Sequence, residues 1–135
     1  MMGRILEAMQ NIRTRVDMVD VLILENNNIP HLPSRAFGSI KVNRLFIENN
    51  RIQTIDRNAF AGVESYLTEI YIKEPSLNAL PHDAINYLRA LSVFSIDSSQ
   101  IQEMPTVSGL QKLKLLKIDK SRITSIPPNS LKNLP

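Results

Sequence analysis

Two histidines are the first candidates for chemistry in this sequence, His31 and His82. Each lies in a proline-containing segment, and the two segments are far apart along the chain. A catalytic site needs a nucleophile or an acid–base pair held on a rigid frame, and the two histidines lie about two repeats apart at different offsets within their units, so they are not expected to form a pair. The chain has no cysteine, and its four glycines are dispersed rather than gathered in a phosphate-binding loop. We therefore predict solvated turn histidines, no enzymatic activity, no metal site and no cofactor.

Acidic residues recur at regular intervals and suggest electrostatic recognition. The seventh position of a recurring unit is occupied in turn by Glu25, Glu48, Lys73, Asp97 and Asp119, a row that we call the acidic lane. Four carboxylates in one lane could attract a basic partner, although the central lysine could equally neutralise its neighbours in a solvated lane. Calcium requires six to eight oxygen ligands, which a single lane interrupted by lysine does not offer. Two residues further on, a column of amide and hydroxyl side chains is predicted to tie neighbouring turns together: Asn27, Asn50, Ser99 and Ser121.

The elements that position these residues are internal repeats. Apolar positions coincide in five consecutive units that begin at residues 19, 42, 67, 91 and 113. Each unit has the form LxxLxLxxNxL and is followed by a further apolar residue, usually with proline after it. The LxL core alternates with a period of two, which is typical of a strand, and the long return segment requires neighbouring strands to be parallel. Stacked units bury the repeated Leu and Ile residues in one continuous core.

These units resemble the leucine-rich-repeat family, in particular its mostly extracellular "typical" class. The resemblance covers residues 19–135 and implies an α/β solenoid, with a parallel sheet on the concave face and short helices or turns on the convex face. The segments 24–37 and 70–75 are also similar to secreted arthropod proteins of this class, including proteins that resemble the non-catalytic subunit of a luciferase. That similarity implies a secreted, non-catalytic protein whose cysteine caps lie outside this segment.

Two units depart from the pattern. In the third unit the Asn position is occupied by Pro75, which has no N–H and no side-chain amide, so this turn should differ locally. In the fourth unit Gly109 stands where Phe37 and Phe60 stand in the first two, and we expect Val107 and Leu110 to fill that space. The residues at the eighth position of each unit are expected to face solvent, and two of them are Glu74 and Ser98.

The residues between the core leucines should point to solvent on the concave face. Ile23, Phe46 and Tyr71 then form a row across three strands, which we call the apolar ladder. Exposed apolar clusters rimmed by polar residues mark interaction sites, whereas aromatic side chains also stabilise sheets by packing across strands. If the ladder is an interaction site, the partner-binding face is made of Val21, Ile23, Glu25, Arg44, Phe46, Glu48, Glu69, Tyr71, Lys73 and Asp97.

Residues outside the repeats affect the predicted organisation. Residues 1–18 contain an amphipathic stretch, read as a helix that covers the first repeat; a membrane-surface helix is the alternative, although its polar face is not strongly basic. The last unit has no polar cap, so we expect a piece of a longer solenoid that self-associates through its open end.

Composition narrows the range of partners. Lys and Arg are scattered and the net charge is only +3, which does not indicate nucleic-acid binding. No apolar run reaches the ~20 residues of a membrane helix. These observations and the repeat predict a non-catalytic module that binds a protein, and the family resemblance implies an extracellular location. The alternatives are an accessory subunit of a secreted enzyme and an ectodomain fragment of a cell-surface receptor or adhesion protein.

Overall fold

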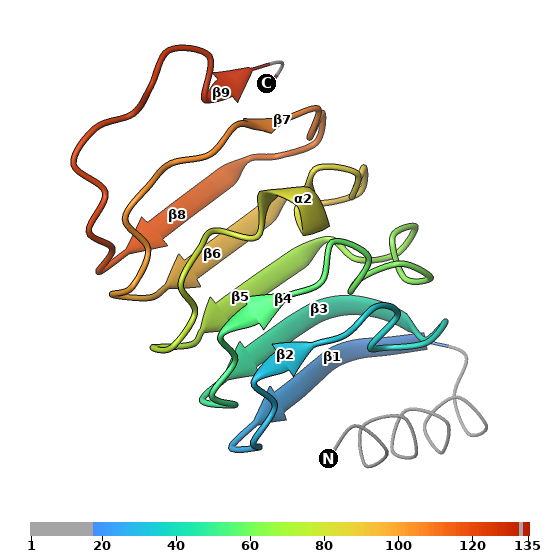
Figure 1. Ribbon diagram of the computed structural model, residues 1–135. Coiled ribbons are helices and arrows are strands. Elements are labelled where there is room, and N and C mark those ends of the chain that lie inside the picture. Colours follow the sequence, from blue (N-terminus) through green and yellow to red (C-terminus); the bar gives the residue numbers. More distant parts are fainter. Residues whose placement is uncertain (1–17, 133) are drawn as a thin grey trace.

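Five strands form one parallel sheet in the computed structural model, which describes residues 18–132 and 134–135 (Figure 1). They follow one another across the sheet in chain order and pair in register. The predicted leucine-rich-repeat solenoid is thereby confirmed. The repeat pattern predicts strands at about residues 21–23, 44–46, 69–71, 93–95 and 115–117, and each of these ranges lies within an observed strand. The strands are β1 (Met18–Glu25), β3 (Lys41–Glu48), β5 (Glu69–Lys73), β6 (Val93–Asp97) and β8 (Leu115–Asp119).

A second, more irregular layer lies over the opposite face of the sheet (Figure 1). It contains two short parallel pairs, β2 (His31–Leu32) with β4 (Thr54–Ile55) and β7 (Val107–Ser108) with β9 (Leu131–Lys132). Among the described residues the only α-helix is the single turn α2 (His82–Ile85). The prolines in these return segments explain their brevity, because proline lacks the N–H that a longer helix or a central strand would need.

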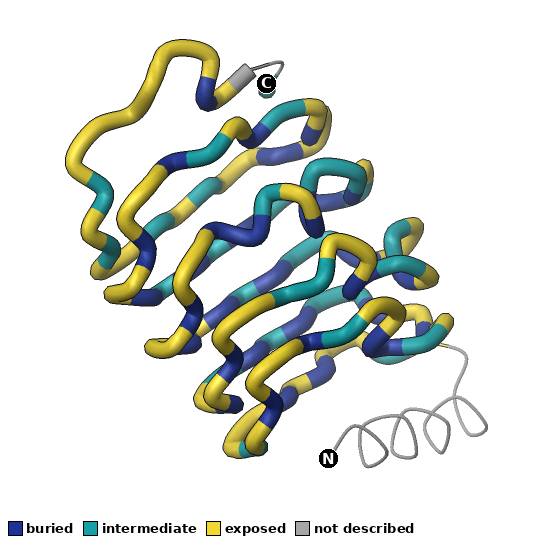
Figure 2. The backbone as a smooth tube through the Cα atoms, viewed as in Figure 1, coloured by how far each residue is buried: buried dark blue, intermediate teal, exposed yellow. Residues whose placement is uncertain are grey.

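The core lies between the two layers, as the buried positions in Figure 2 show. Along each strand the LxL residues face inward because successive side chains point to opposite faces of a sheet. The pairs Leu45 and Ile47, Ile70 and Ile72, and Phe94 and Ile96 are all buried. In the return segments the buried rings of Phe37 and Phe60 stack with centroids 6.0 Å apart and planes 5° from parallel, as their equal offsets predict.

The fourth unit packs as expected around Gly109. Val107 and Leu110 are fully buried and take the space that an aromatic ring occupies in the first two units. Gly109 itself adopts a φ of +77°, a left-handed conformation that glycine tolerates without a Cβ clash.

The last turn has a more open apolar face than the turns before it. Leu116, Ile118 and Ile123 are only partly buried, whereas their counterparts in the preceding unit, Phe94, Ile96 and Ile101, are fully buried. Ile126 and Leu131 are exposed. The helix expected over residues 1–18 lies almost wholly outside the described residues.

Candidate functional site

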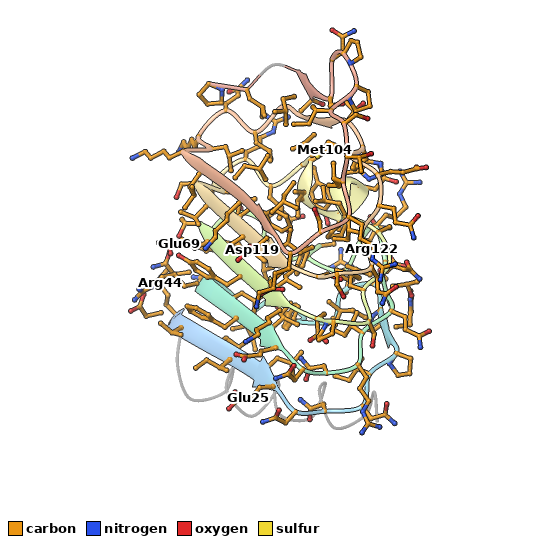
Figure 3. All side chains as sticks on the ribbon, turned by 90° about the vertical axis from the view of Figure 1, so that its left-hand side faces the viewer. Glu25, Arg44, Glu69, Met104, Asp119 and Arg122 are labelled. Atoms are coloured by element: carbon orange, nitrogen blue, oxygen red, sulfur yellow. The ribbon has the colours of Figure 1, made fainter. Side chains whose placement is uncertain are left out.

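The sheet brings all ten predicted partner-binding residues onto one face. Three of them, Glu25, Arg44 and Glu69, are labelled in Figure 3. The in-register pairing of β1, β3, β5 and β6 places them in three neighbouring rows. The side chains differ in exposure: Val21, Ile23, Glu25 and Lys73 are exposed, and Arg44, Phe46, Glu48, Glu69, Tyr71 and Asp97 are partly buried.

The apolar ladder combines a packed aromatic pair with an open aliphatic side chain. The rings of Phe46 and Tyr71 stack with centroids 4.5 Å apart and planes 8° from parallel. Ile23 lies next to Phe46 in register and is 57% exposed. Phe46 and Tyr71 therefore cover part of each other, while Ile23 at the end of the ladder remains available for contact.

Arg44 is held in place at the edge of this surface. Its Nη2 donates to Asp20 Oδ2 over 2.9 Å, and Asn43 Nδ2 donates to Asp20 Oδ1 over 2.9 Å. These hydrogen bonds, first that of Asn43 and then that of Arg44, lower the pKa of the exposed Asp20 carboxyl. The hydrogen bond between Arg44 and Asp20 and the negative charge of Asp20 raise the pKa of Arg44. Sequence reasoning missed Asp20, although its place one residue before Val21, beside Asn43, was a usable signal.

Tyr71 is also tied to its own strand. Its hydroxyl donates to Glu69 Oε1, and this hydrogen bond, together with burial, raises the pKa of the phenol. The bond orients the ring that stacks on Phe46. The aromatic pair is therefore fixed both across the sheet and along it.

The acidic lane is partly compensated by lysines. Lys73 Nζ lies 3.9 Å from Glu48 Oε1, and Lys120 Nζ lies 3.5 Å from Asp97 Oδ2. Within residues 18–132, Glu25 and Asp119 have no salt-bridge partner. The middle of the lane is thus close to neutral, and uncompensated carboxylates lie at its two ends.

The predicted amide column exists in the first two turns. Asn50 is buried; its Nδ2 donates to Leu24 O over 2.8 Å, and its Oδ1 accepts from both the backbone N and Nδ2 of Asn27. Each amide therefore satisfies backbone groups that a short strand leaves unpaired at its end. Asn27 and Asn50 hold the turns after β1 and β3 together.

The next two turns correct the prediction. Glu74 and Ser98, expected to face solvent, are buried, and Ser99, expected in the column, is exposed. The Glu74 carboxylate accepts from the backbone N of Asn50 at 2.9 and 3.0 Å, from Asn50 Nδ2 at 2.9 Å and from the backbone N of Ile52 at 3.3 Å. Ser98 Oγ donates to Leu77 O over 2.7 Å.

Backbone conformation explains this one-residue shift. Asn26, Asn49 and Lys120 adopt left-handed φ angles of 59°, 55° and 59°, which turn the following residue inward. Pro75 bars that conformation at Glu74, because the residue before proline is restricted to extended backbone. The alternation of the strand then continues for one more residue and points Glu74 inward. Ser98 also has no positive φ, and serine visits the left-handed region less readily than asparagine.

The final turn shares the left-handed backbone of the first two, but among the described residues its serine makes a hydrogen bond only within its own turn. Lys120 is left-handed, and Ser121, the residue after it, is partly buried. Ser121 Oγ accepts from the backbone N of Ile123 over 3.4 Å.

Two hollows border the predicted surface. One of about 200 Å³ opens on the concave face, between the aromatic pair and β8. A larger one of about 670 Å³ lies at the turns that follow β1, β3 and β5, and it is lined by Asn26, Asn27, Asn28, Asn49, Arg51, Pro75 and Ser76. Sequence reasoning did not predict the larger hollow. The repeated Asn-rich run is the sequence feature that could have indicated it.

The histidines are not brought together. His31 Nδ1 lies 2.7 Å from Thr54 Oγ1 on the convex side, and His82 Nε2 lies 3.3 Å from Asp83 Oδ1 on α2. Within the part of the chain that the structure describes, no cluster of three or more His, Cys, Asp or Glu side chains is suited to a metal ion. Nor does any helix in that part have the length and apolar character needed to span a membrane.

Comparisons with known proteins agree with the repeat architecture. Residues 18–66 match the leucine rich repeat family. The follicle-stimulating hormone receptor of Notamacropus eugenii is 28% identical over 117 residues, and that of Homo sapiens 27%; each alignment covers 84% of this chain and 17% of the receptor. The thyrotropin receptor of Ovis aries is 35% identical over 71 residues, which are 52% of this chain and 9% of that protein. The chain thus spans about a sixth of the length of the first two receptors.

Proposed function

We propose that the chain is a non-catalytic module that holds a protein partner on the concave face of its sheet. The observation that carries this proposal is the apolar ladder, an aliphatic and aromatic row rimmed by Glu25, Glu48 and Arg44. Aromatic residues and arginine are enriched at the energetic centres of protein interfaces, with charged residues around them. The proposed contact residues are Val21, Ile23, Glu25, Arg44, Phe46, Glu48, Glu69, Tyr71, Lys73 and Asp97.

Packing within the sheet does not account for the whole surface. Cross-strand stacking explains why Phe46 and Tyr71 are neighbours, because such pairs stabilise a sheet. It does not explain Ile23, which is more than half exposed at the end of the ladder, or the exposed Val21 on the same strand. A contiguous apolar surface of this kind favours contact with another macromolecule.

The relatives support a receptor-like role. They are named as receptors for follicle-stimulating hormone and as a thyrotropin receptor, and both ligands are hormones. We infer that the partner is a secreted protein and that the chain works outside the cell, either in a secreted protein or in the ectodomain of a cell-surface receptor. An accessory subunit of a secreted enzyme, the role suggested by the arthropod resemblance, would instead co-purify with a catalytic protein from native tissue.

The direct test is capture by the concave face. Wild-type chain and the double variant Phe46→Ser/Tyr71→Ser are immobilised and exposed to native extract, and in a second arm to purified follicle-stimulating hormone. Truncation of central aromatic residues at an interface costs at least ~2 kcal/mol of binding, or about thirtyfold in affinity, so the variant should lose the captured partner. The same proteins captured equally by both baits would place binding elsewhere on the molecule.

A matched control separates loss of contact from loss of fold. The double variant loses an aromatic stack worth about 0.5–1.5 kcal/mol beyond its buried area. Ile85→Val removes a methylene from the core at a cost of about 0.5–1.5 kcal/mol, and it leaves the concave face unchanged. This control should bind like the wild type although it is less stable, which would show that a modest loss of stability does not by itself abolish capture. Replacing Glu48 and Asp97 with Gln should mainly change the association rate and its salt dependence, because rim charges steer a partner more than they hold it.

A further inference from the structure

The side chains at the fifth position of each repeat unit form a row that has a gap. Phe46, Tyr71, Ser95 and Lys117 lie side by side in register on β3, β5, β6 and β8. Rings occupy the first two positions, whereas Ser95 contributes only a hydroxymethyl group. The hollow of about 200 Å³ opens here, with Tyr71, Ser95 and Lys117 in its lining. One small side chain therefore interrupts an otherwise continuous row of large ones.

The exposed face of the Tyr71 ring looks into this gap. Phe46 is nearly parallel to Tyr71 and covers one ring face, so the opposite face is directed along the row toward Ser95. Neighbouring strands are about 4.8 Å apart, so the rows of Tyr71 and Lys117 are separated by roughly 10 Å. A planar ring placed over Ser95 would lie about 5 Å from each, within the ~4.5–7 Å of aromatic pairs and the ~6 Å of cation–π contacts.

The charges around the gap are only partly paired. Glu48 is compensated by Lys73, and Asp97 by Lys120, whereas Asp119, which also lines the hollow, has no salt-bridge partner among the described residues. Lys117, which is exposed on the far wall, has no salt-bridge partner among residues 18–132. Its ammonium group is complementary to the negative face of an aromatic ring.

We propose that the gap over Ser95 receives an aromatic side chain of the protein partner, stacked on Tyr71 and capped by Lys117. This aromatic slot rests on the proposed function, since it names the chemistry that the partner presents to the concave face. The inserted ring extends the stack of Phe46 and Tyr71 across a third strand. It also places an aromatic anchor on β6, between the side chains of Tyr71 on β5 and Lys117 on β8.

A pair of small probes tests the slot without the natural partner. N-acetylphenylalanine amide is titrated into the isotope-labelled 135-residue chain, and N-acetylcyclohexylalanine amide, of similar shape but without a π system, is titrated in parallel. The aromatic probe should shift the NMR resonances of Ser95, Tyr71 and Lys117, and the saturated probe should bind about two- to tenfold more weakly. Equal affinities, or shifts that avoid these residues, would overturn the proposal.

Two variants sharpen the test. Lys117→Gln should weaken the aromatic probe about two- to fivefold while leaving the saturated probe unchanged, whereas Lys112→Gln, on an exposed turn, should affect neither. Ser95→Phe should fill the slot from within and abolish probe binding with an unchanged far-ultraviolet circular dichroism spectrum. If Ser95→Phe does not fold, the Lys117→Gln comparison decides, and equal loss of both probes in that variant would contradict the cation–π contact.

The slot and the proposed function fail in different ways. Loss of partner capture in the Phe46→Ser/Tyr71→Ser variant, combined with no preference for the aromatic probe, would retain the concave face as a binding surface and reject the slot. Probe binding at Ser95 with partner capture unaffected by the double variant would support an aromatic-binding slot and reject the concave face as the site of capture.

Discussion

The first two turns of the solenoid and the turns that follow place different residues at equivalent positions. In the first two, Asn27 and Asn50 form the polar column and Phe37 stacks on Phe60. In the third and fourth, buried Glu74 and Ser98 take over the column, and smaller aliphatic residues replace the rings. Both regions nevertheless pair their strands in the same register. The fold therefore requires an inward polar group and a filled core at each turn, and it does not require a particular side chain.

The concave face shows the same division. On β1, β3 and β5 the fifth position carries the apolar ladder, whereas β6 and β8 carry Ser95 and Lys117. One half of the face is thus preformed for apolar contact, and the other half leaves an open slot beside it. Because these side chains point away from the core, they can vary without loss of the fold, and under the proposed function such variation would set what the surface binds.

The largest expected effect is on the aromatic core of the first two turns. Phe60→Ala should lower the free energy of unfolding by about 3–5 kcal/mol, because it removes a fully buried ring and one partner of the stack with Phe37. Ile85→Val, at the equivalent position of the third turn, should cost only about 0.5–1.5 kcal/mol. Urea unfolding measures both. A loss below about 1 kcal/mol for Phe60→Ala would mean that the ring is not packed in the core.

Glu74→Ala should have the next largest effect, at the boundary between the two kinds of turn. It deprives Asn50 N and Ile52 N of their acceptor and Asn50 Nδ2 of one of its two acceptors, and orphaned buried donors cost about 1–3 kcal/mol each. Allowing for water that enters the site, we expect a loss of about 2–4 kcal/mol in urea unfolding. Ser98→Ala should cost about 1 kcal/mol, and Ser99→Ala, which is exposed, less than about 0.5 kcal/mol. An effect of Ser99→Ala larger than that of Ser98→Ala would restore the column predicted from sequence.

The open apolar face of the last turn should make the chain self-associate. Ile126 and Leu131 are exposed there, and β8 is an edge strand of the sheet that offers unpaired backbone groups. Ile126→Lys/Leu131→Lys should weaken association at least tenfold, since full burial of one such side chain contributes about 1.5–3 kcal/mol. Ile23→Lys, at the opposite end of the sheet, is the control. Light scattering that finds the wild type monomeric at high concentration, or the control equally disruptive, would contradict association through the last turn.

The smallest expected effect concerns Asp20, which accepts hydrogen bonds from Asn43 and Arg44. The pKa of Asp20 is lowered from its ordinary value of 3.8, chiefly by the hydrogen bond from Asn43, so Asn43→Ala should return it toward 3.8. Because the folded-state pKa is depressed, the stabilisation by Asp20 is present above pH 3.8 and is lost as the pH falls through the lowered value. An NMR titration of the carboxyl carbon measures the shift. An unchanged pKa in Asn43→Ala would assign the effect to Arg44 instead.

The sequence by itself determined the repeat, the direction of the strands and most of the core. Apolar residues at fixed offsets define which side chains face inward, because a strand alternates with a period of two and successive units are in register. The burial of Phe37 and Phe60 and the filling of space by Val107 and Leu110 followed from those offsets alone. The rows on the concave face followed for the same reason.

The tertiary structure decided what depends on a single backbone angle or on a neighbouring turn. Whether the eighth or the ninth residue of a unit points inward depends on one φ angle, and for that reason Glu74 and Ser98 were misplaced while Asn50 was not. The contact between Arg44 and Asp20 joins side chains on adjacent turns, and the hollow over Ser95 exists because large neighbours flank a small residue. Repeat patterns specify the average unit, whereas these features arise from differences between one unit and the next.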